Sequence, residues 1–279
     1  MDPETSYMSP DSVVREIHGD LPGMLIGGLS SLLVQMLHPE VVAGVAQHSL
    51  YKEDPFGRLD RTAQFIGVTS YGSKEEAGGA LDLVRRVHGS VSGVSSRGRA
   101  YTANDPELIT WVHVIEAMSF LAGAQLYGAR RFSGAEQDEY YSDMARVAYD
   151  LGAQWVPTSR DEVREYLDGI QGELELSPEA RDTRNFLMLG VARHLSYEIP
   201  SYALLLGASS SIMPRWAKQK LGLISVPAVS RLAIRPMAGI ASRAVRWVAL
   251  GESGSPERDR RHPGLGKDGE AGIANDDGS

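Results

Sequence analysis

The sequence predicts an all-α protein, with a single mainly helical domain over residues 11–250 and a disordered tail over residues 251–279. Apolar residues recur at spacings of three and four, which is the period of a helix with one buried face. Few stretches alternate apolar and polar residues with the period of two that indicates a strand. Beyond Gly251 the chain is rich in Gly, Asp and Arg and has almost no large apolar residue, so it cannot build a packed core.

Residues that start and stop helices divide the chain. Pro39 interrupts an apolar stretch, and Ser73 is the expected N-cap of a long amphipathic helix with acidic residues in its first turn. A Gly/Ser-rich loop follows over residues 93–98, and Asn104 or Asp105, with Pro106 next to it, marks a further helix start. The predicted helices are Leu29–Leu37, Val41–His48, Arg58–Ser70, Lys74–Val91, Pro106–Tyr127, Ser133–Leu151, Ser159–Gln171 and Pro178–Leu195. The helix to Tyr127 is apolar on most sides, so we expect it at the centre of the core.

Composition excludes several classes of function. The absence of cysteine removes disulfides, iron–sulfur clusters, thiolate zinc sites and a cysteine nucleophile. A net charge of −8 argues against a nucleic-acid partner. Neither a phosphate-binding glycine motif nor a Gly-x-Ser-x-Gly elbow is present, and the seven histidines show no close pair at metal spacing. No signal peptide is visible, and the apolar runs near residues 25–37 and 202–213 are shorter than a membrane span, so we expect no transmembrane segment and a cytoplasmic location.

The segment from Met213 to Leu250 differs from the rest of the chain because it has seven Arg and Lys residues and no acidic residue. Solvated helix faces would account for this charge. The alternative is a basic, apolar surface that meets an anionic substrate tail, an acidic partner or, weakly, a membrane surface.

His88 shares one stripe of its predicted helix with Leu81, Val84, Val87 and Val91. An imidazole on a buried face has lost its hydration, so its nitrogens need a carboxylate, a carbonyl or a metal. A hydrogen-bonded core histidine is the more common of these cases. The functional alternative is a single proximal ligand for haem, which a helical chain without cysteine can still hold.

Two further clusters accompany His88. Arg58, Arg61 and Thr62 are three and four residues apart, so they share a helical face that Phe65 extends. Their guanidinium groups either decorate the surface or, if packed towards the core, bind anions such as propionates or phosphates.

His113 lies inside the most apolar predicted helix, with Glu116 three residues on. These two are either a buried His–Glu pair or an acid and base of a pocket. His38 and His48 flank residues 39–47, and either histidine can simply cap or line a helix end.

An ordered set of motifs carries a family resemblance. The motifs are Leu33–Pro39, Gly44–Ser49, Asp54–Thr62, Arg85–Val91 and Gly98–His113. As a set they resemble the haem-dependent oxygenases typified by latex clearing protein (rubber oxygenase), a family that includes the fungal oxygenase that cleaves the prenyl side chain in mycophenolic acid biosynthesis. The resemblance covers roughly residues 11–250 and implies a helical domain that encloses haem b, with His88 as the proximal iron ligand. It also implies that the catalytic pocket contains Arg58, Arg61, Thr62 and His113. The residues implied to contact the cofactor, besides His88, are Arg58 and Arg85.

One position departs from the family pattern. Where rubber oxygenases place a lysine that caps the iron, this chain has Arg61, and arginine does not deprotonate in proteins. We therefore expect the distal position to be open or held by water or another residue. Glu40 is the nearest candidate for the family's catalytic glutamate.

The activity that the resemblance implies is dioxygen activation at haem b, for oxidative cleavage or oxygenation of a small apolar alkene such as an isoprenoid. Alternatives are a haem peroxidase or hydroxylase of a small secondary metabolite, and a non-catalytic helical protein that binds haem or lipid. Haem content and turnover distinguish these classes.

Overall fold

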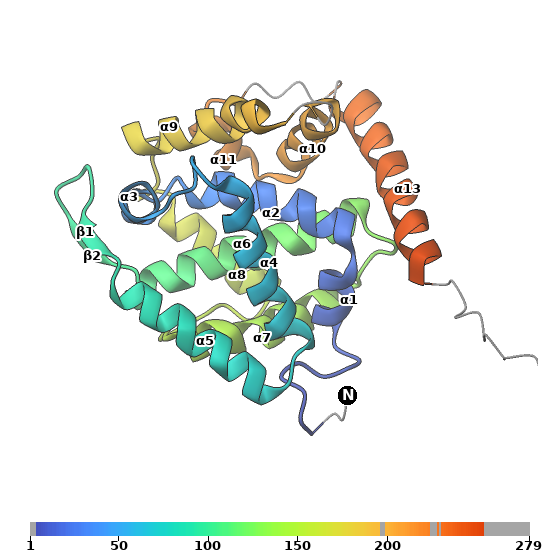
Figure 1. Cartoon of the computed structure of the whole chain (residues 1–279), viewed down its shortest axis with the longest axis horizontal. Coiled ribbons are helices and arrows are strands. Elements are labelled where there is room, and N and C mark those ends of the chain that lie inside the picture. The colour runs from blue at the N-terminus through green and yellow to red at the C-terminus, as the bar shows by residue number, and fades with distance from the viewer. Residues whose placement is uncertain (1–3, 196–198, 224–227, 229, 254–279) are drawn as a thin grey trace, which may run out of the picture.

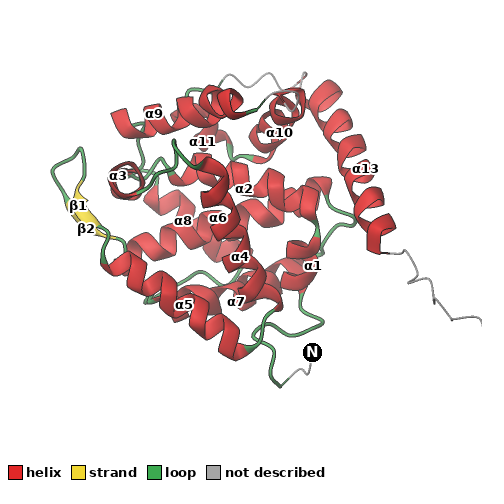
Figure 2. Ribbon diagram, in the orientation of Figure 1, coloured by secondary structure: helices red, strands yellow, loops and turns green. Residues whose placement is uncertain are grey.

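The computed structural model describes residues 4–195, 199–223, 228 and 230–253. Within these residues the fold is helical apart from one short hairpin, which confirms the predicted class (Figure 2). The helices are α1 (Val13–Gly19), α2 (Leu21–Gln35), α3 (Pro39–His48), α4 (Pro55–Tyr71), α5 (Lys74–Gly89), α6 (Pro106–Tyr127), α7 (Gly134–Leu151), α8 (Arg160–Ile170), α9 (Pro178–Asn185), α10 (Ile199–Ile212), α11 (Arg215–Lys220) and α13 (Arg235–Ser253). Two π-helical turns and a 3-10 turn complete the set, at Phe186–Gly190, Ser230–Ile234 and Val191–His194.

Local capping explains where most helices begin. Ser73 and Glu76 form a reciprocal capping box at the start of α5, and Ser133 forms another with Glu136 at α7. The Asp105 carboxylate accepts from the backbone N–H of Glu107 at 2.9 Å at the start of α6. These predicted starts are confirmed because each depends only on residues near it in sequence.

Helix α2 begins earlier than predicted, at Leu21 and not at Leu29. The Asp20 side chain caps it by accepting from the backbone N–H of Gly23 at 2.8 Å. Three glycines in its first turns lower the helix propensity of this stretch. At Gly27 the glycine allows α2 to approach α6 closely, because a Cβ there would come within 2.6 Å of the Ser119 carbonyl oxygen of α6.

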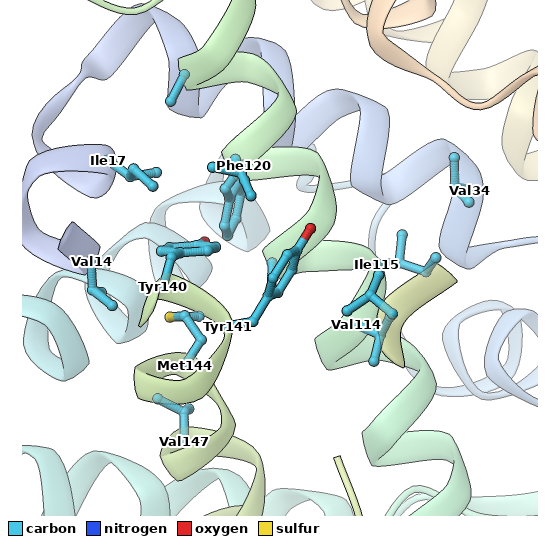
Figure 3. Close-up of a cluster of buried hydrophobic side chains, with 14 of the residues drawn as sticks. Val14, Ile17, Val34, Val114, Ile115, Phe120, Tyr140, Tyr141, Met144 and Val147 are labelled. Carbon is cyan, nitrogen blue, oxygen red and sulfur yellow. The ribbon is translucent and has the colours of Figure 1, made fainter. Parts of the chain in front are cut away.

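Helices α2 and α6 pack along each other at the centre of the fold, as Figure 1 shows, and α1 and α7 pack beside them. Trp111 of α6 is fully buried, and its indole N–H donates to the Gln35 carbonyl at 3.1 Å. Figure 3 shows the neighbouring cluster, in which Phe120 of α6 faces Ile17 of α1 and Tyr140 of α7. The central place predicted for the helix to Tyr127 is confirmed.

The predicted Gly/Ser loop is the turn of an antiparallel hairpin between β1 (Ser92–Val94) and β2 (Ala100–Thr102). Gly98 has φ of 75°, which a glycine adopts without strain. The hairpin stands at one edge of the molecule (Figure 1). As a result α5 ends at Gly89, two residues before the predicted end.

Several other boundaries differ from the predictions, including the starts of α3 at Pro39 and of α4 at Pro55. The helix predicted over residues 178–195 is α-helical only as far as Asn185 and continues as the π and 3-10 turns. The predicted tail begins at residue 251, whereas α13 continues to Ser253; the rest of the predicted tail lies outside the described residues.

One described helix, α6, is long and apolar enough to cross a bilayer, and 72% of its most apolar window is buried inside the fold, as in the core helix of a globular domain. Helices α1 and α2 together also meet the length and composition criteria, but they are bent by 89°.

Candidate functional site

A cavity of about 340 Å³ lies between α2, α4 and α6, and the segment from α9 to α10 contributes to its wall. Its size is within the usual range for a small-molecule site. Most of the lining is aliphatic or aromatic, and the polar side chains in it are few. The polar lining residues are His18, Ser31, Tyr51, Arg58, Thr62, Tyr71, Glu116, Thr183 and Tyr202.

Exposed apolar side chains form the rim of the cavity. Leu21 and Leu25 of α2 and Phe56 and Leu59 of α4 line it, yet each is between 41% and 51% exposed. Large apolar residues exposed together often mark the entrance of a binding groove. We call these four residues the cavity rim.

Glu116 of α6 places a carboxyl group in the cavity wall. Burial raises its pKa from 4.5 to about 7, and a hydrogen bond from Gln35 only partly offsets this rise. The carboxyl therefore carries a proton in about half of the molecules near neutral pH. A group in this state donates or accepts a proton readily.

His18 of α1 lines the same cavity, and both of its ring nitrogens have partners. The Ser70 hydroxyl donates to the Ile66 carbonyl at 2.6 Å, so it accepts from His18 Nδ1, which lies 2.7 Å away. His18 Nε2 is then the acceptor for the Tyr140 hydroxyl at 3.2 Å. Burial lowers the His18 pKa to about 3, so the ring is neutral and fixed in one tautomer.

Arg58 and Thr62 of α4 both line the cavity. The Arg58 guanidinium donates to the Ser49 hydroxyl at 3.1 Å, and no carboxylate forms an ion pair with it within the described part of the chain. Burial, and secondarily the nearby charge of Arg61, lowers the Arg58 pKa. A half-buried cation without a counter-ion is a natural partner for an anionic group of a ligand. The Thr62 hydroxyl donates to the Arg58 carbonyl at 3.1 Å.

Arg61 and Arg85 are placed elsewhere. The Arg61 side chain is 67% exposed and lies 3.6 Å from the Asp54 carboxylate. Of the three residues predicted to share one helical face, only Arg58 and Thr62 therefore line the cavity. Arg85 of α5 pairs with Asp82 and donates to the Asp150 carbonyl at the surface. Neither arginine lines the cavity.

His88 of α5 is half-buried and does not line the cavity. Its Nδ1 atom is buried and has no hydrogen-bond partner among the described residues, and burial lowers its pKa, so the ring is neutral near pH 7. The predicted buried stripe holds at Leu81, which is 3% exposed, and fails at Val87, which is 53% exposed. Helices α4 and α7, which pack against α5, therefore cover only part of this helix face.

His113 of α6 is buried, and burial lowers its pKa to about 4. It does not line the cavity, and no ion pair joins it to Glu116 among the described residues. The interpretation of these two residues as a buried pair is therefore wrong. Residues three apart on a helix point in directions about 60° apart, and here only Glu116 turns to the cavity.

Glu40 is buried beside His38, with 3.3 Å between its Oε2 atom and His38 Nδ1, and it accepts from the Ser95 hydroxyl at 3.0 Å. His38 packs against the Trp111 ring. His48, at the end of α3, lies 3.0 Å from the Ser92 carbonyl of the hairpin through Nε2. These three residues join α3 to its neighbours and do not line the cavity.

The sequence predicted Glu116 only together with His113, as a buried pair or as an acid and base of a pocket, and it did not predict His18. Glu116 had a detectable signal, because it is an acidic residue within the apolar interior of α6. His18 had none, because only the tertiary packing of α1 against α2 and α4 brings it to the cavity.

The fold and the cavity together define a helical protein with an apolar binding site for a small molecule. Residues 15–249 match the family described as ER-bound oxygenase mpaB/B'/Rubber oxygenase, catalytic domain, and the chain belongs to this family. No curated protein and no solved structure matches the chain. Membership supports oxygenase activity and therefore an oxidoreductase that uses a substrate and dioxygen.

Proposed function

We propose that the chain is a haem b-dependent oxygenase that acts on a small apolar alkene, such as an isoprenoid. The observation that carries the proposal is the apolar cavity with a buried acid, in a chain that belongs to an oxygenase family. Apolar walls favour a hydrocarbon substrate and exclude bulk water from the reacting groups.

His88 meets one requirement of haem b, which is held through a neutral imidazole: its ring is neutral and its buried Nδ1 atom has no hydrogen-bond partner among the described residues, although His88 does not line the cavity. No group of three or more His, Asp or Glu residues in the described chain is arranged to hold a free metal ion, and a haem iron with a single protein ligand needs no such group. His88 would hold the iron, and Arg58, which has no carboxylate partner, would pair with a propionate. When bound, haem b supplies the binding and activation of dioxygen.

The chain's own residues prepare the substrate side. The aliphatic wall binds and orients the hydrocarbon, and Glu116 holds or releases a proton at its carboxyl oxygen near neutral pH. His18 keeps its neutral tautomer because Ser70 and Tyr140 occupy both of its ring nitrogens. Its hydrogen bonds link α1 to α4 and α7, and the ring does not exchange protons with a ligand. Arg61 pairs with Asp54 at the surface and does not line the cavity, so it has no role in the proposed site.

The test uses haem-loaded protein, squalene as an isoprenoid alkene, and isotopically labelled dioxygen. We expect dioxygen consumption and label in carbonyl or hydroxyl products. Gly28→Leu, which adds bulk to the cavity wall 3.7 Å from Phe120, should reduce turnover at least roughly tenfold, as expected when an added side chain overlaps the substrate volume. Gly78→Leu in α5, where a Cβ meets open space, is the matched control and should retain turnover.

Two results would contradict the proposal. Turnover driven by peroxide, without dioxygen consumption, would assign the site to a peroxidase. Bound haem without turnover on any alkene would assign it to a haem-binding protein.

A further inference from the structure

The outer face of α13 carries an apolar stripe that no described element covers. Met237, Ile240, Trp247 and Val248 fall on one side of the helix and are 57%, 65%, 78% and 52% exposed. Leu232, in the turn just before the helix, is 81% exposed. Apolar side chains gathered in this way on one helix face usually mark a contact surface.

The opposite face of α13 is held against the fold. Ala238 and Ser242 are buried, and the Arg246 guanidinium donates to the Asp20 carboxylate and to the Tyr127 carbonyl, each at 2.9 Å. Figure 1 shows α13 along one edge of the molecule, beside α10. Because these contacts fix the rotation of the helix, the apolar stripe points away from the protein core.

The surroundings of the stripe are cationic. Residues 213–250 contain seven Arg and Lys residues and no acidic residue. Arg243 of α13 is exposed and forms no ion pair within the described chain. An exposed, unpaired cation thus lies on the same helix as the exposed apolar side chains.

The ion pair also fixes where α13 lies relative to the cavity. Arg246 pairs with Asp20, and Asp20 caps α2 next to Leu21 of the cavity rim. Helix α13 is therefore held against the start of α2, where one residue of the rim lies.

We infer that the α13 stripe docks on the surface of an anionic lipid bilayer, with Trp247 and Ile240 in the acyl boundary and Arg243 among the headgroups. A bilayer surface offers apolar chains and negative charge in one continuous layer, which matches this combination of side chains. Docking would place the cavity rim near the lipid, so an apolar ligand would enter without crossing water.

The experiment is flotation of the full chain with vesicles of phosphatidylcholine alone or mixed with phosphatidylglycerol. We expect binding to the anionic vesicles at low salt that weakens at high salt. The double variant Ile240→Asn with Trp247→Ser should bind at least roughly tenfold more weakly, because burial of each apolar side chain is worth about that factor. Arg243→Glu should weaken binding several-fold.

The matched control is Leu83→Asn with Val87→Asn, which removes two side chains of α5 that are 55% and 53% exposed. Melting temperatures show that each variant is folded, and the control should bind as the wild type does. Equal binding by the two double variants would overturn the inference, as would wild-type protein that ignores anionic vesicles at low salt.

A dimer that the α13 variant alone converts to monomer, with no vesicle binding, would assign the stripe to a second copy of the chain and also overturn the inference. The measurement needs neither haem nor substrate, so its failure is distinguishable from failure of the proposed oxygenase function.

Discussion

Glu116→Gln replaces a half-buried carboxyl in the cavity wall by an amide of the same shape. The folded protein raises the pKa of Glu116 from 4.5 to about 7, so between these values the folded state keeps a proton that the unfolded state has lost. Stability therefore falls as pH rises through this window and stays constant above it. At about 1.4 kcal/mol for each unit of pKa, ionisation of Glu116 costs about 3 kcal/mol near pH 8 and less than about 1 kcal/mol near pH 5.

Thermal unfolding followed by circular dichroism measures this difference. The variant should melt roughly 6–10 °C above the wild type near pH 8 and close to it near pH 5. Glu107→Gln removes an exposed carboxylate from the first turn of the same helix and should show no such pH-dependent gain. If Glu116→Gln changed the melting temperature equally at both pH values, or lowered it near pH 8, the carboxyl would not be held in an apolar cavity.

Three further outcomes are expected. Gly123→Ala should destabilise the fold by about 1–3 kcal/mol in urea unfolding, because its Cβ would lie 2.3 Å from the Gly23 carbonyl oxygen; Gly79→Ala, in open space on α5, should be neutral or slightly stabilising. Wild-type stability should decrease as pH falls from 6.5 towards 3, because the folded protein lowers the His18 pKa to about 3. His18→Gln should remove about 2 kcal/mol of that loss at pH 5. A pH profile of stability that is the same in the variant and the wild type would contradict this. Arg246→Ala should speed hydrogen exchange in α13 and leave exchange in α6 unchanged, because it removes the ion pair that holds α13 to the start of α2; uniform change would contradict this.

The fold was predictable from the sequence to the extent that its signals are local. Ser73, Ser133 and Asp105 mark helix starts because each cap depends on a hydrogen bond to a residue two or three positions on. The start of α2 was missed because Gly27 has low intrinsic helix propensity, and its reason for being there is the close approach of α6. A single sequence does not show that approach.

The candidate site was predictable only in part, for a similar reason. Periodicity shows which residues are neighbours on a helix, but it does not show which direction faces a cavity. Arg58 and Thr62 line the cavity, whereas Arg61, one residue before Thr62, lies at the surface with Asp54. His18 joins the site through the packing of helices far apart in sequence, which no local pattern encodes.

The visible absorption spectrum of the protein purified from haem-supplemented cells tests the proposed function most directly, beside that of His88→Ala. We predict a Soret band in the wild type that is lost in the variant, while both remain helical, with a stability cost of about 1–3 kcal/mol for the substitution. Normally ligated haem in His88→Ala, or a folded wild type without a Soret band, would contradict the assignment of His88 as the haem ligand.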